Sequence, residues 1–224
     1  MIGIIAAMDI EVEAVKKYAQ ISHSEEIGGC VYHYGTMFGK DIVLCKSGVG
    51  KVGAAICTTI LCAKNKIDMV INVGTAGGLL VEEQVLDVVI SDHVVEADFD
   101  TSPLDGEEGI GLQWSVNQEM VSRCIEAAKK AGARYHVGTV ASQDIFMERE
   151  EDFKKLMSRF PKSACSEMEA GAVGHVCTNF NVPFVIVRGL SDNVHHHENS
   201  MEFSEYASKA SEQSARIITE FIKG

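Results

Sequence analysis

Carboxylate side chains that come shortly after apolar segments are the groups of this sequence best suited to acid–base chemistry. Glu11 and Asp192 each follow an apolar run, and Glu169 stands where a helix is expected to begin. A carboxyl that is partly removed from water has a raised pKa, so Asp192 could hold a proton near neutral pH and donate it. An ionised Glu169 could instead accept hydrogen bonds from two neighbouring hydroxyls of a ligand.

Each of these carboxyls also has a purely structural interpretation. The helix macrodipole favours acidic residues at a helix start, which alone would account for Glu167 or Glu169. Because these two flank Met168, one is expected to face inward and the other outward. Asx turns account for many aspartates that follow strands, as Asp192 does. The residues by themselves leave both interpretations open.

Three other motifs invite a binding function but do not have the required spacing. The stretch KSGVGKVG has Cys45 and Val52 where a phosphate-binding loop needs glycine and Ser or Thr, and NVGTAGGL lacks the dinucleotide spacing. Both are expected to be tight turns that join a strand to a helix. Consecutive histidines at 195–197 point in different directions, so they cannot all bind one ion, and no metal site is predicted.

Net charge and cysteine usage exclude several classes of partner. A formal charge of −12 without a basic cluster disfavours nucleic acid and anionic membrane surfaces, and suits a small neutral or cationic ligand. No apolar run reaches the roughly 18 residues of a membrane helix, and the start has no basic signal-peptide region. The seven scattered cysteines contain no CxxC pair. We therefore expect a cytoplasmic protein with reduced, mostly buried thiols.

Apolar strands that alternate with helices predict one three-layer α/β domain over residues 1–224. Residues 93–115 are expected to be irregular, and residues 75–78 to form a turn. Asn199 with Glu202 three residues later gives a modest capping signal for the last helix. Strands are expected at 2–7, 30–38, 41–45, 69–74, 85–92, 136–142 and 182–192, with a strand passing into a helix over 163–177. Helices are expected at 9–15, 51–64, 117–130, 148–160 and 200–223.

In such sheets the ligand lies beyond the carboxyl ends of the strands. This rule selects segments that carry acidic or small residues next to long apolar runs. The selected segments are Met8 with Glu11, 47–50, 74–78, 142–147, 167–169 and 188–192.

Five ordered motifs in these segments resemble the bacterial 5′-methylthioadenosine/S-adenosylhomocysteine nucleosidases of the purine nucleoside phosphorylase superfamily. The resemblance runs from Met1 to about Ile222, and the five motifs together make it specific. They are Met8-Asp9-x-Glu11, Ser47-Gly48-Val49-Gly50-Lys51, Asn72-x-Gly74-Thr75-Ala76-Gly77-Gly78, Glu167-Met168-Glu169-Ala170 and Val187-Arg188-Gly189-Leu190-Ser191-Asp192.

The resemblance implies a mixed central β-sheet flanked by helices, usually in a homodimer. It also implies hydrolysis of the N-ribosidic bond without metal or cofactor, so the partners would be a small nucleoside and water. Glu11 would act as general base on the water, and Asp192 as general acid to adenine N7. The other implied site residues bind or position substrate: Met8, Val49, Thr75, Gly77, Phe146, Met147, Met168, Glu169, Arg188 and Ser191.

The resemblance also implies a choice between hydrolysis and phosphorolysis. A fixed negative charge at Glu11 would disfavour an anionic phosphate on the face of the site where this carboxylate lies, and it would suit water. The alternatives are a nucleoside phosphorylase, a hydrolase for a futalosine-type nucleoside, and a non-catalytic binding protein on the same fold. Residues 94–114 lack the aromatic-rich sequence that helps relatives enclose the 5′ substituent, partly across the dimer interface, so the preferred 5′ group is left open.

Overall fold

The computed structural model describes the backbone of residues 1–195 and 199–224 and, within these ranges, every side chain except those of residues 199–202. Ten strands occur in the described chain: β1 (Ile2–Ala6), β2 (Gln20–Ile27), β3 (Cys30–Met37), β4 (Lys40–Lys46), β5 (Met69–Gly78), β6 (Val88–Asp100), β7 (Ile110–Ser115), β8 (Tyr135–Ser142), β9 (Ser163–Glu167) and β10 (Phe184–Asn193). The helices are α1 (Asp9–Lys16), α2 (Lys51–Lys64), α3 (Ser102–Asp105), α4 (Gln118–Lys130), α5 (Glu150–Arg159), α6 (Ala170–Asn179) and α7 (Asn199–Lys223), with a 3₁₀ turn at Gly106–Gly109.

The strands form one mixed sheet that closes on itself at one end. β1 pairs in parallel with β4 and β5, whereas β2, β3 and β4 are antiparallel neighbours. β10 pairs in parallel with β5 and antiparallel with β6, while β9 pairs with both β5 and β8. Since β6 also pairs with β8, five strands (β5, β10, β6, β8 and β9) make a closed ring.

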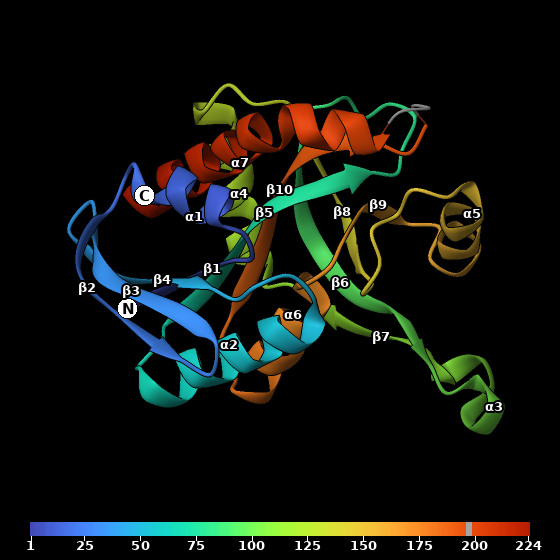
Figure 1. Ribbon diagram of the computed structural model, residues 1–224, viewed down its shortest axis with the longest axis horizontal. Coiled ribbons are helices and arrows are strands. Elements are labelled where there is room, and N and C mark those ends of the chain that lie inside the picture. Colours follow the sequence, from blue (N-terminus) through green and yellow to red (C-terminus); the bar gives the residue numbers. More distant parts are fainter. Residues whose placement is uncertain (196–198) are drawn as a thin grey trace.

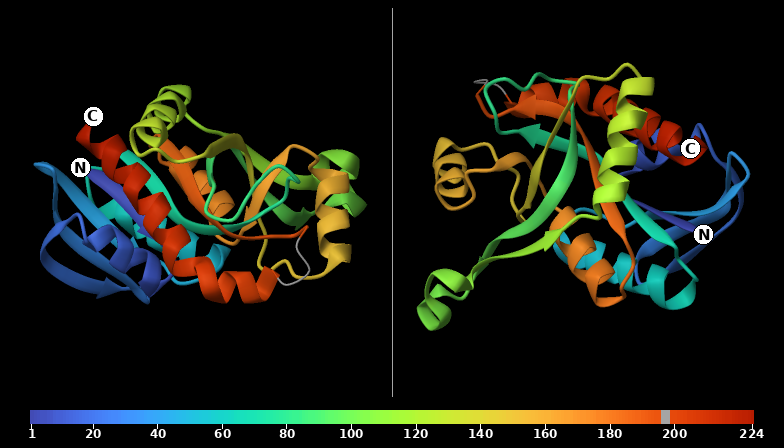
Figure 2. Two further views of the ribbon diagram at one scale, coloured as in Figure 1. Left: turned by 90° about the horizontal axis from the view of Figure 1, so that it is seen from above. Right: turned by 180° about the vertical axis from the view of Figure 1, so that it is seen from behind.

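Helices cover both faces of this sheet, as expected from the alternation of strands and helices (Figure 1). α1 and α4 pack against α7, which lies over β5 and β10, and α2 packs against α6 on the opposite face. The view from behind shows the same two layers with the sheet between them (Figure 2). Every residue of β10 is buried, because the strand lies between sheet neighbours and beneath helices. The predicted three-layer mixed α/β architecture is confirmed.

Two local predictions are wrong, and one strand was not predicted. The turn predicted for residues 75–78 is instead the end of β5, because β10 and β9 provide hydrogen-bonding partners on its two sides. The segment 93–115 is mostly ordered as the end of β6 and the whole of β7, which pair with each other and form an arm that projects from the body (Figure 1). The polar strand β2 was not predicted, because its alternation is weak and its partner β3 stabilises it.

Two predictions concern residues that lie partly outside the described chain. The capping signal of Asn199 and Glu202 depends on side chains that are not described, and the histidine loop is described only as far as His195. All seven cysteines are free thiols, and all are buried except the partly exposed Cys62. Within the described residues, no helix combines the length and apolar character needed to cross a bilayer, and no cluster of side chains has a metal-binding arrangement.

Candidate active site

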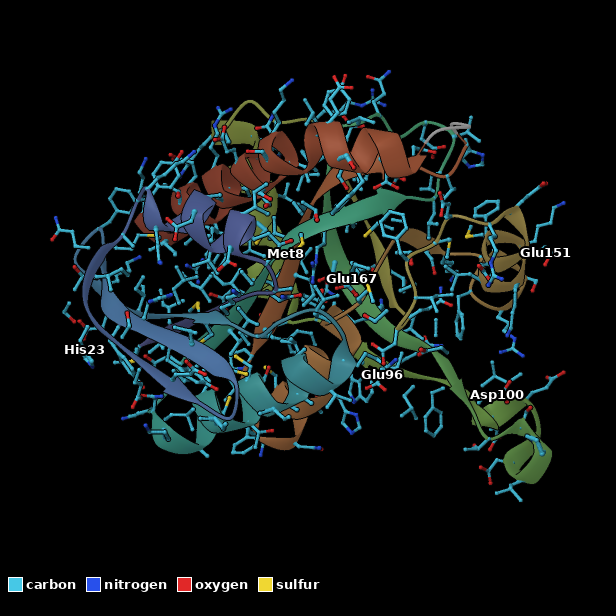
Figure 3. All side chains as sticks on the ribbon, viewed as in Figure 1. Met8, His23, Glu96, Asp100, Glu151 and Glu167 are labelled. Carbon is cyan, nitrogen blue, oxygen red and sulfur yellow. The ribbon has the colours of Figure 1, made fainter. Side chains whose placement is uncertain are left out.

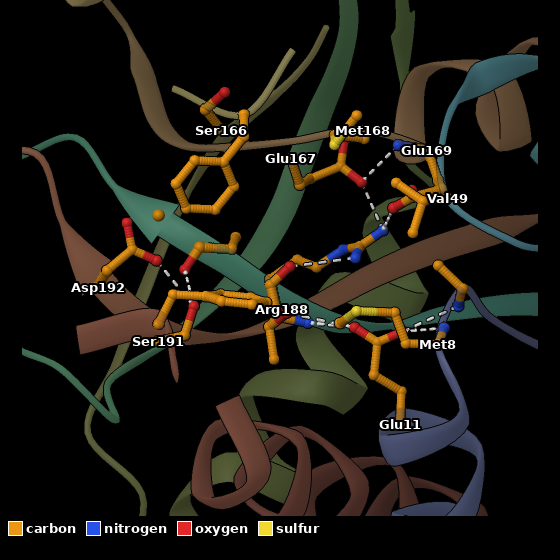
Figure 4. Close-up of a pocket in the computed structure, with 16 residues that line it drawn as sticks. Met8, Glu11, Val49, Ser166, Glu167, Met168, Glu169, Arg188, Ser191 and Asp192 are labelled. Atoms are coloured by element: carbon orange, nitrogen blue, oxygen red, sulfur yellow. Dashed lines mark hydrogen bonds and ion pairs between the residues drawn. The ribbon is translucent and has the colours of Figure 1, made fainter. Parts of the chain in front are cut away.

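A cavity of about 180 Å³ opens at the carboxyl ends of the strands, as the rule for α/β sheets predicts. β1 and β4 lead into the segments that carry Met8 and Val49, while β5, β9 and β10 contribute their last residues directly. Figure 4 shows these side chains converging on the cavity from the different strands. In the whole molecule, Met8 and Glu167 lie near the centre, far from the arm that carries Asp100 (Figure 3).

Glu11 is a buried carboxylate that is surrounded by hydrogen-bond donors. Its Oε2 accepts bonds from the backbone N–H groups of Ala7 and Met8 at 2.9 and 3.0 Å. Its Oε1 accepts bonds from the backbone N–H of Thr75 at 2.9 Å and from the Thr75 hydroxyl at 3.3 Å. An ionised carboxylate only accepts hydrogen bonds, so four donors suit its charged form. These four bonds fix the orientation of the Glu11 carboxyl group at the edge of the cavity.

Arg188 brings positive charge into the interior beside the two glutamates that flank Met168. Its Nη2 lies 2.5 Å from Oε2 of Glu167 and 3.4 Å from Oε2 of Glu169, and it donates to Asn72 Oδ1 at 2.6 Å. The side chains of Arg188, Glu167 and Glu169 are almost fully buried. The expectation that one of the two glutamates faces outward is therefore wrong. A buried guanidinium needs carboxylate partners, and β10 places Arg188 where both can reach it.

The two glutamates have different tasks at the start of α6. Glu167 accepts bonds from the backbone N–H groups of Glu169 and Ala170, so it caps the helix. Glu169 instead accepts a bond from the Gly50 N–H at 2.8 Å, which ties the start of α2 to the cavity. Burial raises the pKa of Glu169 to about 8, although the positive charge of Arg188 opposes the rise. Arg188 lies closer to Glu167 than to Glu169, and the negative charge of Glu167 adds to the rise. Glu169 can therefore carry a proton near neutral pH.

The raised pKa of Glu169 predicts a pH-dependent stability. The folded state keeps the Glu169 proton up to about pH 8, whereas the unfolded state releases it near the ordinary glutamate pKa of 4.5. The free energy of unfolding should therefore fall as pH rises through this window, with a slope of at most about 1.4 kcal/mol per pH unit. Glu169→Gln should remove this contribution. Urea unfolding of both proteins across the window measures it, and parallel pH profiles would contradict the prediction.

Asp192 lies on the other part of the cavity, near the end of β10. The pairing of β10 with β5 shifts between Leu190 and Asp192, so a bulge at Ser191 interrupts the regular alternation. The Ser191 hydroxyl donates to Asp192 Oδ1 at 2.8 Å, and the Asp192 side chain is almost fully buried. Asp192 is thus a strand residue, so the Asx-turn interpretation does not apply.

A second, smaller cavity of about 40 Å³ adjoins the first and extends the slot. It lies between Asp192 and the segment after β8 that carries Phe146 and Met147. The ring of Phe146 is nearly half exposed and meets the ring of Phe203 edge-to-face at 5.5 Å. An aromatic wall thus faces the carboxyl of Asp192 across a narrow space, which suits a flat heterocycle.

The chain is similar to known proteins over nearly its whole length. The family model of the phosphorylase superfamily matches residues 1–223. Curated 5′-methylthioadenosine/S-adenosylhomocysteine nucleosidases of Oceanobacillus iheyensis and Halalkalibacterium halodurans are 36% and 40% identical, over 99% and 97% of this chain and 98% and 95% of theirs. The chain belongs to this nucleosidase family of the phosphorylase superfamily.

Solved structures of the superfamily share the fold over nearly the whole chain. The Neisseria meningitidis nucleosidase in complex with methylthio-immucillin-A has a TM-score of 0.94 and 29% identity, covering 99% of this chain and 98% of that one. Futalosine hydrolase of Helicobacter pylori has a TM-score of 0.92 and 26% identity, covering 99% and 96%. The same fold therefore occurs in a methylthioadenosine/S-adenosylhomocysteine nucleosidase and in a futalosine hydrolase.

The nucleosidase motifs predicted from sequence converge on these two cavities. Met147 lines the smaller cavity. The other predicted site residues line the larger one: Met8, Glu11, Val49, Thr75, Gly77, Phe146, Met168, Glu169, Arg188, Ser191 and Asp192. Their chemical roles stay predictions.

Ala7, Ser166 and Phe203 also line the larger cavity but were not predicted to do so, and for Glu167 only the helix-start interpretation was offered. A buried arginine in an apolar strand was a signal that two carboxylates were needed. No local signal marked Phe203, because only the packing of α7 brings it to the nucleosidase cavity.

Gly77 keeps space for Asp192 in this nucleosidase site. A Cβ atom on Gly77 would lie 2.9 Å from Asp192 Oδ2, so Gly77→Ala must displace the carboxyl. A misplacement of about 1 Å can cost about 10²-fold in rate, and we expect a loss of this order in kcat. Steady-state kinetics with a thermal melt measures the effect. Wild-type kcat in a folded Gly77→Ala protein would show that catalysis does not depend on the exact position of the Asp192 carboxyl.

Proposed function

We propose that this chain hydrolyses the N-ribosidic bond of 5′-methylthioadenosine and S-adenosylhomocysteine, releasing adenine and the 5-thio-substituted ribose. One observation carries the proposal: two buried carboxyls, Glu11 and Asp192, line the same cavity in different surroundings. Glu11 accepts bonds from four donors after β1, whereas Asp192 lies on β10, where the Ser191 hydroxyl and the backbone of Gly77 are among its neighbours. Such contrasting environments allow one carboxyl to be ionised while the other carries a proton.

The reaction then proceeds by general acid–base catalysis. An adenine anion is a poor leaving group, so Asp192 donates its proton to N7 as the N-ribosidic bond breaks, with Ser191 orienting the carboxyl. The ribose acquires oxocarbenium character at the anomeric carbon. Glu11 holds the water that attacks this carbon and removes its proton. Positioned groups of this kind contribute about 10²–10⁴-fold each.

The remaining lining residues suit the parts of such a nucleoside. Glu169 and the backbone of Met168 bind the ribose hydroxyls, and a protonated Glu169 can donate as well as accept. Phe146 stacks on adenine while the backbone of Met147 reads its edge. Met8 and Val49 line the sugar and thioether region. Thr75, Gly77 and Arg188 surround the water site.

Charge at the water site favours hydrolysis over phosphorolysis. Arg188 is already paired with Glu167, and Glu11 places a second carboxyl group near it. A phosphate ion at the water site would meet carboxylates rather than an unpaired cation. The site therefore favours water over phosphate as the attacking group. No metal or cofactor enters the proposed reaction.

We also propose a single-domain chain that acts as a cytoplasmic homodimer. The α2 residues Val52 and Ile56 are exposed, and they follow the exposed Val49 at helical spacing beside the cavity rim. An apolar stripe of this kind is typical of a protein interface. Light scattering after gel filtration tests the dimer, and a monomer at micromolar concentration would contradict it.

A substrate panel tests the activity. Purified protein is incubated with methylthioadenosine, S-adenosylhomocysteine, adenosine and futalosine, with and without phosphate, while free base and sugar are followed. We expect adenine and a reducing thio-sugar from the first two substrates without phosphate. Dependence on phosphate with release of a sugar 1-phosphate would establish a phosphorylase, and turnover of futalosine alone would establish a futalosine hydrolase.

A further inference from the structure

The aromatic segment of the cavity has little regular structure of its own. Residues 143–149, which carry Phe146 and Met147, belong to neither a helix nor a strand. Phe146 is nearly half exposed, so burial alone does not hold it over the cavity. A stacking ring must nevertheless be positioned before it can bind a base well, because ordering a loop on binding costs affinity.

A cluster of three charged residues joins this segment to two other elements. Lys51 Nζ lies 2.7 Å from Asp98 Oδ2 and 2.9 Å from Asp144 Oδ2, and its backbone N–H donates to Asp144 Oδ1 at 2.8 Å. The Asp144 N–H in turn donates to Asp98 Oδ2 at 3.0 Å. The cluster therefore connects the start of α2, the arm strand β6 and the aromatic segment.

The same cluster is directly linked to the ribose side of the cavity. Gly50, which precedes Lys51, donates its N–H to Glu169, and Val49 lines the cavity. Phe146 follows Asp144 by two residues. Lys51 thus lies between the segment that holds the sugar side of the slot and the segment that holds its aromatic wall.

We propose that Lys51, Asp98 and Asp144 form an ionic latch that positions the aromatic segment 143–149 over the nucleoside slot. The proposal rests on the proposed function for its kinetic consequences, but the geometry of the latch does not depend on it. Lys51 is a positioning residue here, because it lines neither of the two cavities.

The electrostatics favour a latch that stays closed at neutral pH. Burial opposes the charge on Lys51, but hydrogen bonds to Asp98 and Asp144 outweigh it, and the pKa of Lys51 is raised. Burial likewise opposes the charge on Asp144, but the bonds from Lys51 hold its pKa below the usual range. The Lys51 side chain is 16% exposed, so solvent screens this network less than an ordinary surface pair.

Lys51→Met tests the latch, because it keeps the length of the side chain and removes the charge. We expect KM for methylthioadenosine to rise about ten-fold while kcat changes less than about three-fold, since binding and not chemistry needs the segment ordered. Asp144→Asn should have a similar effect, and the double variant should be no worse than Lys51→Met. Lys51→Arg should keep KM within about three-fold of wild type.

Lys64→Met is the matched control. Lys64 ends the same helix and pairs with Glu25 at 2.8 Å, outside the two cavities. It should leave KM unchanged. A fall in thermal stability with wild-type KM in Lys51→Met would overturn the latch and leave a structural role only.

Hydrogen exchange of the ligand-free protein supplies a readout that is independent of turnover. Amides of residues 143–149 should exchange faster in Lys51→Met and Asp144→Asn than in wild type or Lys64→Met. Unchanged exchange in this segment would overturn the latch. A wild-type protein that cuts neither nucleoside would instead refute the proposed function, whatever the exchange shows.

Discussion

Asp192→Asn should lower kcat for methylthioadenosine by about 10²–10⁴-fold while the protein still folds. The amide is almost the same size as the carboxyl and can still accept the bond from the Ser191 hydroxyl. It has no acidic proton, however, so adenine would have to leave as an anion. Steady-state kinetics measures the loss, and a thermal melt within a few degrees of wild type shows that the fold is kept.

The leaving group distinguishes this role from a general disturbance of the site. A nitrophenyl 5-methylthioriboside has a leaving group that needs no proton, so Asp192→Asn should cut it almost as fast as wild type does. Ser191→Ala, which keeps the acid and removes its orienting hydroxyl, should give a smaller loss with methylthioadenosine. Equal losses on both substrates in Asp192→Asn would remove Asp192 from the acid role.

Glu11→Gln should lower kcat by a similar factor for a different reason. Attack by water is common to both substrates, so here the nitrophenyl riboside should lose as much rate as methylthioadenosine does. Asp192→Asn and Glu11→Gln should therefore behave oppositely on the nitrophenyl riboside, and this difference distinguishes the role of the base from that of the acid.

The glutamine at position 11 should also cost stability. Both carboxylate oxygens of Glu11 accept bonds from N–H groups, and glutamine has only one oxygen. Its NH₂ group must therefore face a donor, which leaves buried groups unsatisfied and costs about 1–3 kcal/mol. Urea unfolding measures this cost.

Glu13→Gln is the control for position 11, since Glu13 lies on the same helix and its largely exposed side chain pairs only weakly with Lys16. It should change neither rate nor stability. Adenine binding by calorimetry shows whether the Glu11→Gln slot is intact. Undiminished adenine release from methylthioadenosine would refute Glu11 as the base.

Residues 75–78 show why local pattern misassigned part of the fold. Small and glycine-rich residues are typical of turns, and nothing in their immediate sequence indicates a strand. In the folded chain, β10 and β9 lie on either side and satisfy their backbone groups. The glycines are needed because Asp192 and Asn193 approach closely, which is a property of the neighbouring strand and not of this segment.

The alternation of strands and helices, the strand ends at which a ligand would bind, and the five ordered motifs could all be predicted before the fold was known. These depend on periodicity and on local residue types, which are present before the chain folds. Three features of the site depend on the folded arrangement: Glu167 and Glu169 share Arg188, Phe203 reaches the cavity, and Lys51 joins Asp98 to Asp144. Each of these contacts joins residues far apart in the chain. The pairing and the burial of these side chains therefore depend on which strands and helices become neighbours.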